Sequence, residues 1–432
     1  MSRKRAVADA AAASIETRAS WVAAAAALGV MSVAFGAPYI AVVGLRDIAA
    51  ELGGARSVPA LCYSFAWLGT AVGGVAMGGI AERIGIRWTA MFGAVMIAVG
   101  LALASFGGAT QLYIAHGLFI GVLGLGGINA PVYVYVARWF DRRRGTALAL
   151  ISSGMYVAGT VWPPIFTQAI AGFGWRETMM FFALVEAAVV LPTAYFFFDP
   201  PPAGADSPRP GGPVLAVGAP VLALRPNLAL ALIAGASFLC CVPMAMPQSH
   251  LVAFCGDLGI SPERGAAMLS VLLGTAFVSR QVWGYVSDRI GGLNTVLAGS
   301  ICQSTAVAAL LFTQDEAGLF AVTAFFGFGF SGIIPAYVLA IRQLFPASEA
   351  HWRVPIIMLC SGSGMAFGGW IAGALYDHYG FYGAAFAAGL GANLVNLAIV
   401  GFLAARGWSE PDARRHRVHF ADATRRQTST TL

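Results

Sequence analysis

Twelve long apolar segments constrain the fold of this chain more than any other feature of its sequence. The segments fall at about 21–45, 58–80, 88–107, 111–137, 146–170, 177–198, 227–254, 265–286, 293–312, 318–341, 354–375 and 380–404. A helix crosses the roughly 30 Å of a bilayer's hydrocarbon core in about 20 residues. Because lipid offers no hydrogen-bond partner for the backbone, each segment must be helical. We therefore predict an all-α membrane protein with twelve transmembrane helices.

Composition supports this class and argues against an enzyme. Hydrophobic residues make up 58% of the chain and charged residues only 11%, whereas charged residues make up about 25% of a soluble domain. The six cysteines lie in or beside apolar segments without metal-ligand spacing. We find no nucleophile–base constellation, metal motif or phosphate loop. No catalytic activity, metal or cofactor is expected.

Basic residues predict the orientation in the membrane. Only Arg46, Arg56, Arg176 and Arg264 fall in loops on the side opposite the termini, and Arg280 alone lies within a segment. The rest of the 26 Lys and Arg residues share a side with both termini, which the positive-inside rule makes cytoplasmic. The net charge of +6 then reflects cytoplasmic loops and needs no nucleic-acid partner. We expect a protein of the bacterial inner (plasma) membrane, embedded in the lipid bilayer.

The chain divides into two similar halves around a Pro/Gly-rich stretch. We predict a cytoplasmic N-terminal arm at 1–20, six-helix bundles at 21–198 and 227–404, a cytoplasmic linker at 199–226 and a basic cytoplasmic tail at 405–432. The linker contains PPPAGADSPRPGGP, a composition that cannot bury enough apolar surface to fold by itself. It therefore separates the two bundles.

A repeated motif supports this division. The pattern G-x-x-x-[D/E]-R-I-G occurs after the second and the eighth segments, with Gly78 and Gly284 as the first glycines, 206 positions apart. The first glycine permits close helix approach, the acid–base pair can tie a helix end to its neighbour, and the second glycine permits a tight turn. We predict a conformational-switch motif at Gly78, Glu82, Arg83, Gly85, Arg87, Gly284, Asp288 and Arg289.

These motifs resemble the signature loop of the major facilitator superfamily, whose second half carries a degenerate copy. The resemblance covers roughly residues 20–405. It implies twelve helices in two pseudo-symmetric six-helix bundles, which rock about a central site and open alternately to each side of the membrane.

Three further segments resemble the monocarboxylate porters and the oxalate:formate antiporters. They are RWFDRRRGTA at 138–147, HLV at 250–252 followed by DLGI at 257–260, and Arg280 with Gly284 and Asp288-Arg289. Departures of this sequence from those two families narrow the class of substrate. No Lys or Arg lies between Arg353 and Arg406, where oxalate exchangers carry a second cation. Ala276 replaces the aspartate of animal lactate porters and the first segment lacks their lysine, so their proton route does not carry over.

Arg280 is the strongest candidate site residue. A guanidinium inside a span must face a neighbouring helix or a watery cavity to keep hydrogen-bond partners, and its planar fork fits the two oxygens of a carboxylate. The alternative is a structural ion pair, for example with Glu186. His250 could bind substrate or exchange a proton, or simply be capped at the rim. Glu186 is either a proton site or a structural hydrogen-bond partner.

Tyrosines complete the predicted substrate site. Tyr39, Tyr133, Tyr156 and Tyr337 lie on segments that line the cavity in such porters, and each offers an apolar ring with one hydroxyl. Any one of them could instead pack against a helix or face lipid.

Together these residues predict a monomeric secondary transporter of a small organic anion, a monocarboxylate, coupled to protons by symport. Anion exchange of the oxalate/formate type is an alternative within the same class. Efflux of drug-like compounds and a substrate-sensing receptor on a transporter scaffold are further alternatives. The direction of transport is left open.

Overall fold

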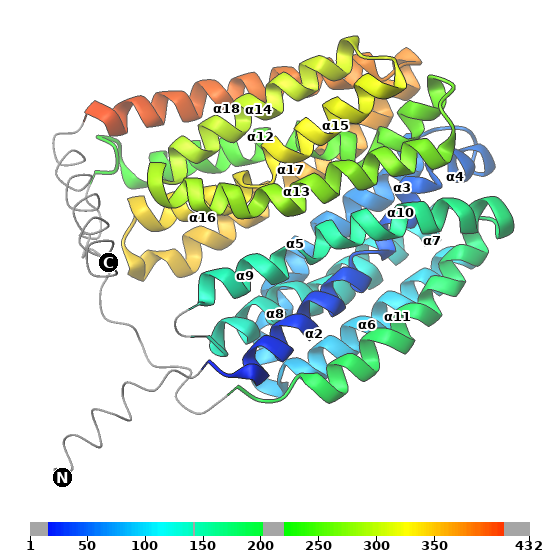
Figure 1. Ribbon diagram of the computed structural model, residues 1–432, viewed down its shortest axis with the longest axis horizontal. Helices are drawn as coiled ribbons and strands as arrows, with labels where there is room; N and C mark the ends of the chain where they lie inside the picture. Colours follow the sequence, from blue (N-terminus) through cyan, green and yellow to red (C-terminus); the bar gives the residue numbers. More distant parts are fainter. Residues whose placement is uncertain (1–15, 141–142, 202–219, 410–432) are drawn as a thin grey trace, which may run out of the picture.

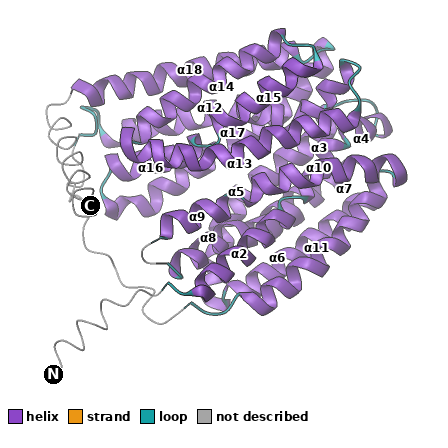
Figure 2. Ribbon diagram, viewed as in Figure 1, coloured by secondary structure: helices purple, strands orange, loops and turns teal. Residues whose placement is uncertain are grey.

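A computed structural model describes residues 16–140, 143–201 and 220–409 (Figure 1). Most of the predicted N-terminal arm, linker and basic tail, and Asp141-Arg142 of the RWF segment, lie outside the described residues. Within them the structure is almost entirely helical (Figure 2). Twelve helices are long and apolar enough to cross a membrane. The predicted all-α membrane fold is confirmed.

The first six spans form the N-terminal bundle. Its elements are α2 (Arg18–Ala34) and α3 (Ala37–Val43), which together make the first span, α4 (Leu45–Glu51), α5 (Ser57–Ile84), α6 (Ile86–Phe106), α7 (Ala109–Ile114), the π-helix η1 (Ala115–Leu125) and α8 (Gly126–Arg138), α9 (Arg144–Ser152) and α10 (Gly154–Phe173), and α11 (Trp175–Phe197).

The last six spans form the C-terminal bundle. Its elements are α12 (Pro226–Asp257), α13 (Pro262–Ile290), α14 (Gly292–Phe312), α15 (Glu316–Phe330) and α16 (Ile333–Leu344), the short 3₁₀ helix η2 (Ala347–Glu349), α17 (Ala350–Tyr379) and α18 (Gly383–Ser409).

The molecule has two ends along the span direction. α2 begins and α18 ends on the same side, which we name the terminal end (Figure 1). The loops after α4, α6, α10, α12, α14 and α17 lie at the opposite side, the distal end.

Glycines with positive φ reveal the pseudo-symmetry of the bundles. Gly53 and Gly259, Gly85 and Gly291, and Gly174 and Gly380 all have φ between +79° and +101°, and the members of each pair are 206 positions apart. A residue with a side chain would be strained there. Turns of the same shape thus recur at equivalent positions, as expected for two pseudo-symmetric bundles.

The two bundles meet mainly along two helix pairs. α5 packs against α17, and α10 packs against α13. At the distal half, α12 of the C-terminal bundle also contacts α3 and α4 of the N-terminal bundle. α2, the terminal half of the first span, packs extensively only on elements of its own bundle among the described residues. The bundles are therefore closed together at the distal end and diverge toward the terminal end (Figure 1).

The contacts of the switch motif differ from those that the sequence predicts. A Cβ added at Gly78 or Gly284 would meet nothing within 4 Å, so the predicted close helix approach is absent from this conformation. Glu82 and Asp288 are exposed and form no salt bridge within the described residues. Arg87 pairs with Asp199 at 2.6 Å, inside its own bundle. The physical reason is that the bundles stand apart at the terminal end, where the motif lies.

Candidate functional site

Arg280 lies between the two bundles. It is carried by α13 and is half-buried. Its Nη1 donates a hydrogen bond to the carbonyl oxygen of Ser152, at the end of α9 in the opposite bundle, over 3.0 Å. Its Cζ stands 5.0 Å from the ring centre of Tyr156, a distance at which a cation is attracted to the aromatic face.

No carboxylate neutralises this cation within the described residues. Arg280 takes part in no salt bridge there. The structural ion pair with Glu186 that the sequence left open is not formed, because both carboxylate oxygens of Glu186 are buried without a hydrogen-bond partner. A guanidinium held by one carbonyl and one ring keeps free donors for an anionic ligand.

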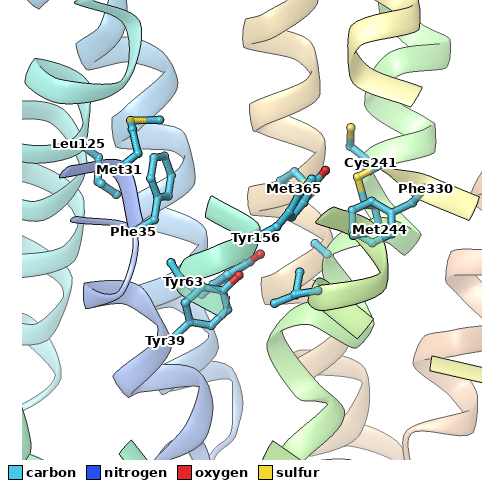
Figure 3. Close-up of a cluster of buried hydrophobic side chains, with 14 of the residues drawn as sticks. Met31, Phe35, Tyr39, Tyr63, Leu125, Tyr156, Cys241, Met244, Phe330 and Met365 are labelled. Atoms are coloured by element: carbon cyan, nitrogen blue, oxygen red, sulfur yellow. The ribbon is translucent and has the colours of Figure 1, made fainter. Parts of the chain in front are cut away.

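Two of the predicted tyrosines lie near Arg280. Tyr156 of α10 contacts it directly, and Tyr133 of α8 lies within electrostatic range of its charge. Tyr156 also packs edge-on against Phe330 of α15, with ring centres 5.8 Å apart. Figure 3 shows Tyr156 between the N-terminal helices and the side chains of Met244 and Phe330. The cation is thus next to aromatic surface contributed by both bundles.

A small pocket opens in the N-terminal bundle beside this aromatic group. Its lining consists of Phe35, Pro38, Tyr39, Tyr63, Ala66, Trp67, Thr70, Leu125 and Met155. Tyr39 and Tyr63 point their hydroxyls toward the facing bundle (Figure 3). The Tyr63 hydroxyl has no hydrogen-bond partner among the described residues. The pocket has mostly apolar walls with a few hydroxyls, and its free volume of about 10 Å³ is room for about one water molecule in this conformation.

Tyr337 does not belong to this site. It is fully buried in the C-terminal bundle, and its hydroxyl donates to Oδ1 of Asn396 over 2.7 Å. Asn396 in turn donates to Asn393 and to Ser300. A hydroxyl committed to an internal polar network leaves no donor for substrate, so we treat Tyr337 as a packing residue.

We expect Tyr337→Phe to lower stability and leave substrate binding unchanged. Loss of one buried hydrogen bond costs about 1 kcal/mol and leaves the Asn396 oxygen without its donor. Thermal unfolding of the purified protein should therefore begin at a lower temperature, while the KM for transport should match wild type. An altered KM would return Tyr337 to the site.

His250 lies in a different place from Arg280. It is fully buried near the distal end of α12, with Nδ1 3.0 Å from the Tyr382 hydroxyl and Nε2 2.8 Å from the carbonyl oxygen of Gly369. Both ring nitrogens are occupied. The structure thus favours the capped histidine that the sequence left open, over a direct substrate ligand.

Sequence reasoning missed the polar residues that join the bundles at the distal end, among them Arg56 and Asp257. The sequence predicts only a loop at Arg56 and a family-like motif at Asp257. The available signal was that Arg56 is one of the few basic residues on that side.

Comparison with known proteins identifies the family. The sequence profile of the Major Facilitator Superfamily matches residues 19–350 and 256–430. The chain is a member of the Major Facilitator Superfamily. Its fold agrees with solved superfamily structures: the nucleoside transporter NupG has a TM-score of 0.69 at 12% identity over 90% of this chain and 99% of that chain. A bacterial homologue of the human lysosomal transporter Spinster, in an inward-facing and occupied conformation, has a TM-score of 0.62 at 15% identity. The match covers 89% of this chain and 94% of that chain.

More similar sequences within the superfamily come from eukaryotes. Monocarboxylate transporter 13 of Bos taurus is 28% identical over 71% of this chain and 71% of its own length. The MFS transporter asaE of Aspergillus flavus is 26% identical over 71% of this chain and 68% of its own length. This superfamily member is therefore an integral membrane transporter that resembles the monocarboxylate branch, and no catalytic family is indicated.

Proposed function

We propose that this protein carries a small organic monocarboxylate across the membrane, with Arg280 binding the carboxylate. The observation that carries the proposal is the position of Arg280: a half-buried cation between the bundles, stacked near Tyr156 and without a carboxylate partner in the described chain. A guanidinium within a membrane span is costly unless it is paired, and a substrate anion would supply that pair. The resemblance to monocarboxylate transporter 13 supports the same class.

The surroundings of Arg280 favour one carboxylate attached to an apolar body. The last two spans, from Arg353 to Arg406, contain no other Lys or Arg, so no second cation is available there for a dicarboxylate. The pocket beside Tyr39 and Tyr63 is lined mainly by aromatic and apolar side chains. An acid with a hydrophobic body could place its carboxylate at Arg280 and its apolar body against the ring of Tyr156.

Alternating access follows from the arrangement of the bundles. The positive-inside rule predicts that the terminal end is cytoplasmic, and with that orientation this conformation would open the site to the cytoplasm. The bacterial inner membrane and the monomeric state stay predictions. Binding of an anion would replace the Arg280–Ser152 contact between the bundles. The loaded carrier could then rearrange, whereas the empty, charged one is held.

Glu186 is the better candidate for proton coupling. Its two carboxylate oxygens are fully buried and have no hydrogen-bond partner in the part of the chain that the structure describes, and such a group can take up or release a proton as its surroundings change. His250 is the second candidate, although both its ring nitrogens are already bonded.

Uptake into proteoliposomes tests the proposal. We expect labelled monocarboxylates with a small apolar body to enter, while the corresponding amides, which share shape but lack charge, do not. An inward proton gradient should accelerate uptake, and Glu186→Gln should remove that acceleration while leaving exchange intact. If amides are carried as well as acids, the assignment of a carboxylate substrate is wrong.

Two alternatives predict different results in the same assay. Anion exchange predicts uptake that needs an acid inside the vesicle and persists when the proton gradient is collapsed. Efflux of drug-like compounds, which the aromatic pocket lining favours, predicts transport of several uncharged aromatic compounds.

A further inference from the structure

A partly buried charge cluster joins the two bundles at the distal end. Arg56, at the N-terminus of α5, donates from Nη1 and Nη2 to the two carboxylate oxygens of Asp257, each over 2.5 Å. Asp257 is the last residue of α12 in the opposite bundle. Arg56 also donates to the Tyr382 hydroxyl over 3.1 Å and lies 3.7 Å over the ring of Tyr376. The paired side chains are only 10% and 24% exposed.

This environment makes the ion pair stronger than an ordinary surface pair. A bidentate geometry adds energy and specificity, and reduced solvent exposure weakens screening. Burial opposes the charge on Arg56, but the hydrogen bonds and charge of Asp257 raise the pKa of Arg56 above its ordinary value. The pair therefore stays ionised and attractive.

Asp377 makes a second connection at the same place. Its carboxylate oxygens accept hydrogen bonds from the backbone N–H groups of Arg56 and Ser57, over 2.7 and 2.9 Å. These are the first amides of α5, a helix that has no side-chain cap from its own segment. A carboxylate from α17 thus caps a helix of the other bundle and offsets its positive dipole end.

Close backbone packing accompanies this cap. Gly373, one turn before Asp377, brings α17 against α5: an added Cβ would lie 2.9 Å from the Ser57 Cα and 3.1 Å from the Arg56 carbonyl oxygen. Only a residue without a side chain fits here. The contact can therefore persist only while the distal ends of the bundles are together.

Comparison of pseudo-equivalent positions explains why the ion pair crosses between bundles. Asp257 lies 206 positions after Glu51, the same offset that relates the positive-φ glycines. Glu51 is paired inside its own bundle, accepting from Arg176 over 2.6 and 3.0 Å. Hydrogen bonds from Arg176 hold the pKa of Glu51 below its ordinary value. The position equivalent to Arg176 in the C-terminal bundle is Tyr382.

The C-terminal acid therefore lacks the partner that its counterpart has. With tyrosine in place of arginine, Asp257 can be neutralised only by a cation from elsewhere, and Arg56 of the other bundle supplies it. His250 fixes the Tyr382 hydroxyl from the other side, over 3.0 Å, which makes His250 a positioning residue for this cluster.

We propose that Arg56, Asp257 and Asp377 form a latch that holds the distal end closed, and that Tyr382 creates it by leaving Asp257 without a partner in its own bundle. For the distal end to open, the ion pair and the cap on α5 must both break. The latch acts in the empty transporter and does not depend on which substrate is carried.

Restoring the missing partner tests this latch without removing any of its charges. We expect Tyr382→Arg to pair with Asp257 inside the C-terminal bundle, as Arg176 does with Glu51, and to release Arg56. Tyr382→Phe is the matched control, because it removes the hydroxyl's bonds to Arg56 and His250 but leaves the Arg56–Asp257 ion pair in place and adds no cation. The separation of its distal ends should therefore stay close to wild type.

The readout is the separation of the distal ends in substrate-free protein. Spin labels at Phe106→Cys and Phe312→Cys sit on the distal ends of α6 and α14, at side chains that are 80% and 84% exposed. Cys302 and Cys360, the two native cysteines that are partly exposed, are replaced by serine. Electron–electron double resonance in nanodiscs should then show a new, longer distance population in Tyr382→Arg only.

A second variant covers the case in which the added arginine prevents folding. Arg56→Gln combined with Asp257→Asn removes both charges without leaving either unpaired, and it should also shift the population to longer distances. Thermal unfolding first establishes that this double variant and Tyr382→Arg are folded. If both variants then keep the wild-type distances, the proposed latch does not exist. Because no substrate is present, that result would leave the proposed monocarboxylate site unaffected.

Discussion

Arg280→Ala should lower the transport of monocarboxylates roughly 100-fold. A guanidinium that binds both oxygens of a carboxylate makes charge-assisted hydrogen bonds worth about 1.5–3 kcal/mol each. Each 1.4 kcal/mol of lost binding free energy lowers affinity about tenfold, so a loss of about 3 kcal/mol lowers uptake roughly 100-fold. Initial rates of labelled-acid uptake in proteoliposomes measure this effect.

A conservative variant separates charge from geometry. Arg280→Lys keeps the positive charge but loses the planar fork and the stacking on Tyr156, so we expect an intermediate rate, roughly tenfold below wild type. Arg264→Ala is the control, because Arg264 is exposed and pairs with Glu316 at the surface, where ion pairs contribute little. If Arg280→Ala carries acids as well as wild type, the efflux alternative gains support.

Gly368→Val should have the largest effect on stability. Gly368 lies where α17 crosses α12, and a Cβ there would stand 2.1 Å from the carbonyl oxygen of Val242. In a membrane, helix association depends on such close contact because lipid provides no hydrophobic force between helices. Forcing backbones apart costs about 3 kcal/mol, which should lower the thermal unfolding temperature markedly.

The matched control for this substitution is Gly235→Val on α12. An added Cβ at Gly235 would meet nothing within 4 Å, so the unfolding temperature should stay close to wild type. Equal destabilisation by both variants would mean that valine disfavours these helices intrinsically and that the α12–α17 crossing is not the cause.

The sequence by itself predicted the spans and the twofold arrangement. Segment lengths are fixed by bilayer thickness and by the need to satisfy every backbone group, so hydropathy along the chain suffices. The span predicted at 265–286 corresponds to α13, Pro262–Ile290. The repeat at Gly78 and Gly284 predicted the pseudo-symmetry seen in the turns at Gly85 and Gly291. Arg280 also stood out in the sequence, because a charge inside an apolar run must face a neighbouring helix or a watery cavity.

Only the tertiary structure decided which polar residues meet. Tyr156 and Tyr337 look alike in the sequence, yet one lies beside Arg280 and the other donates to Asn396 inside a bundle. Arg56 and Asp257 are 201 positions apart. Local sequence determines that each segment is a helix. Which helix faces which depends on how two bundles pack, and that packing is a property of the whole chain.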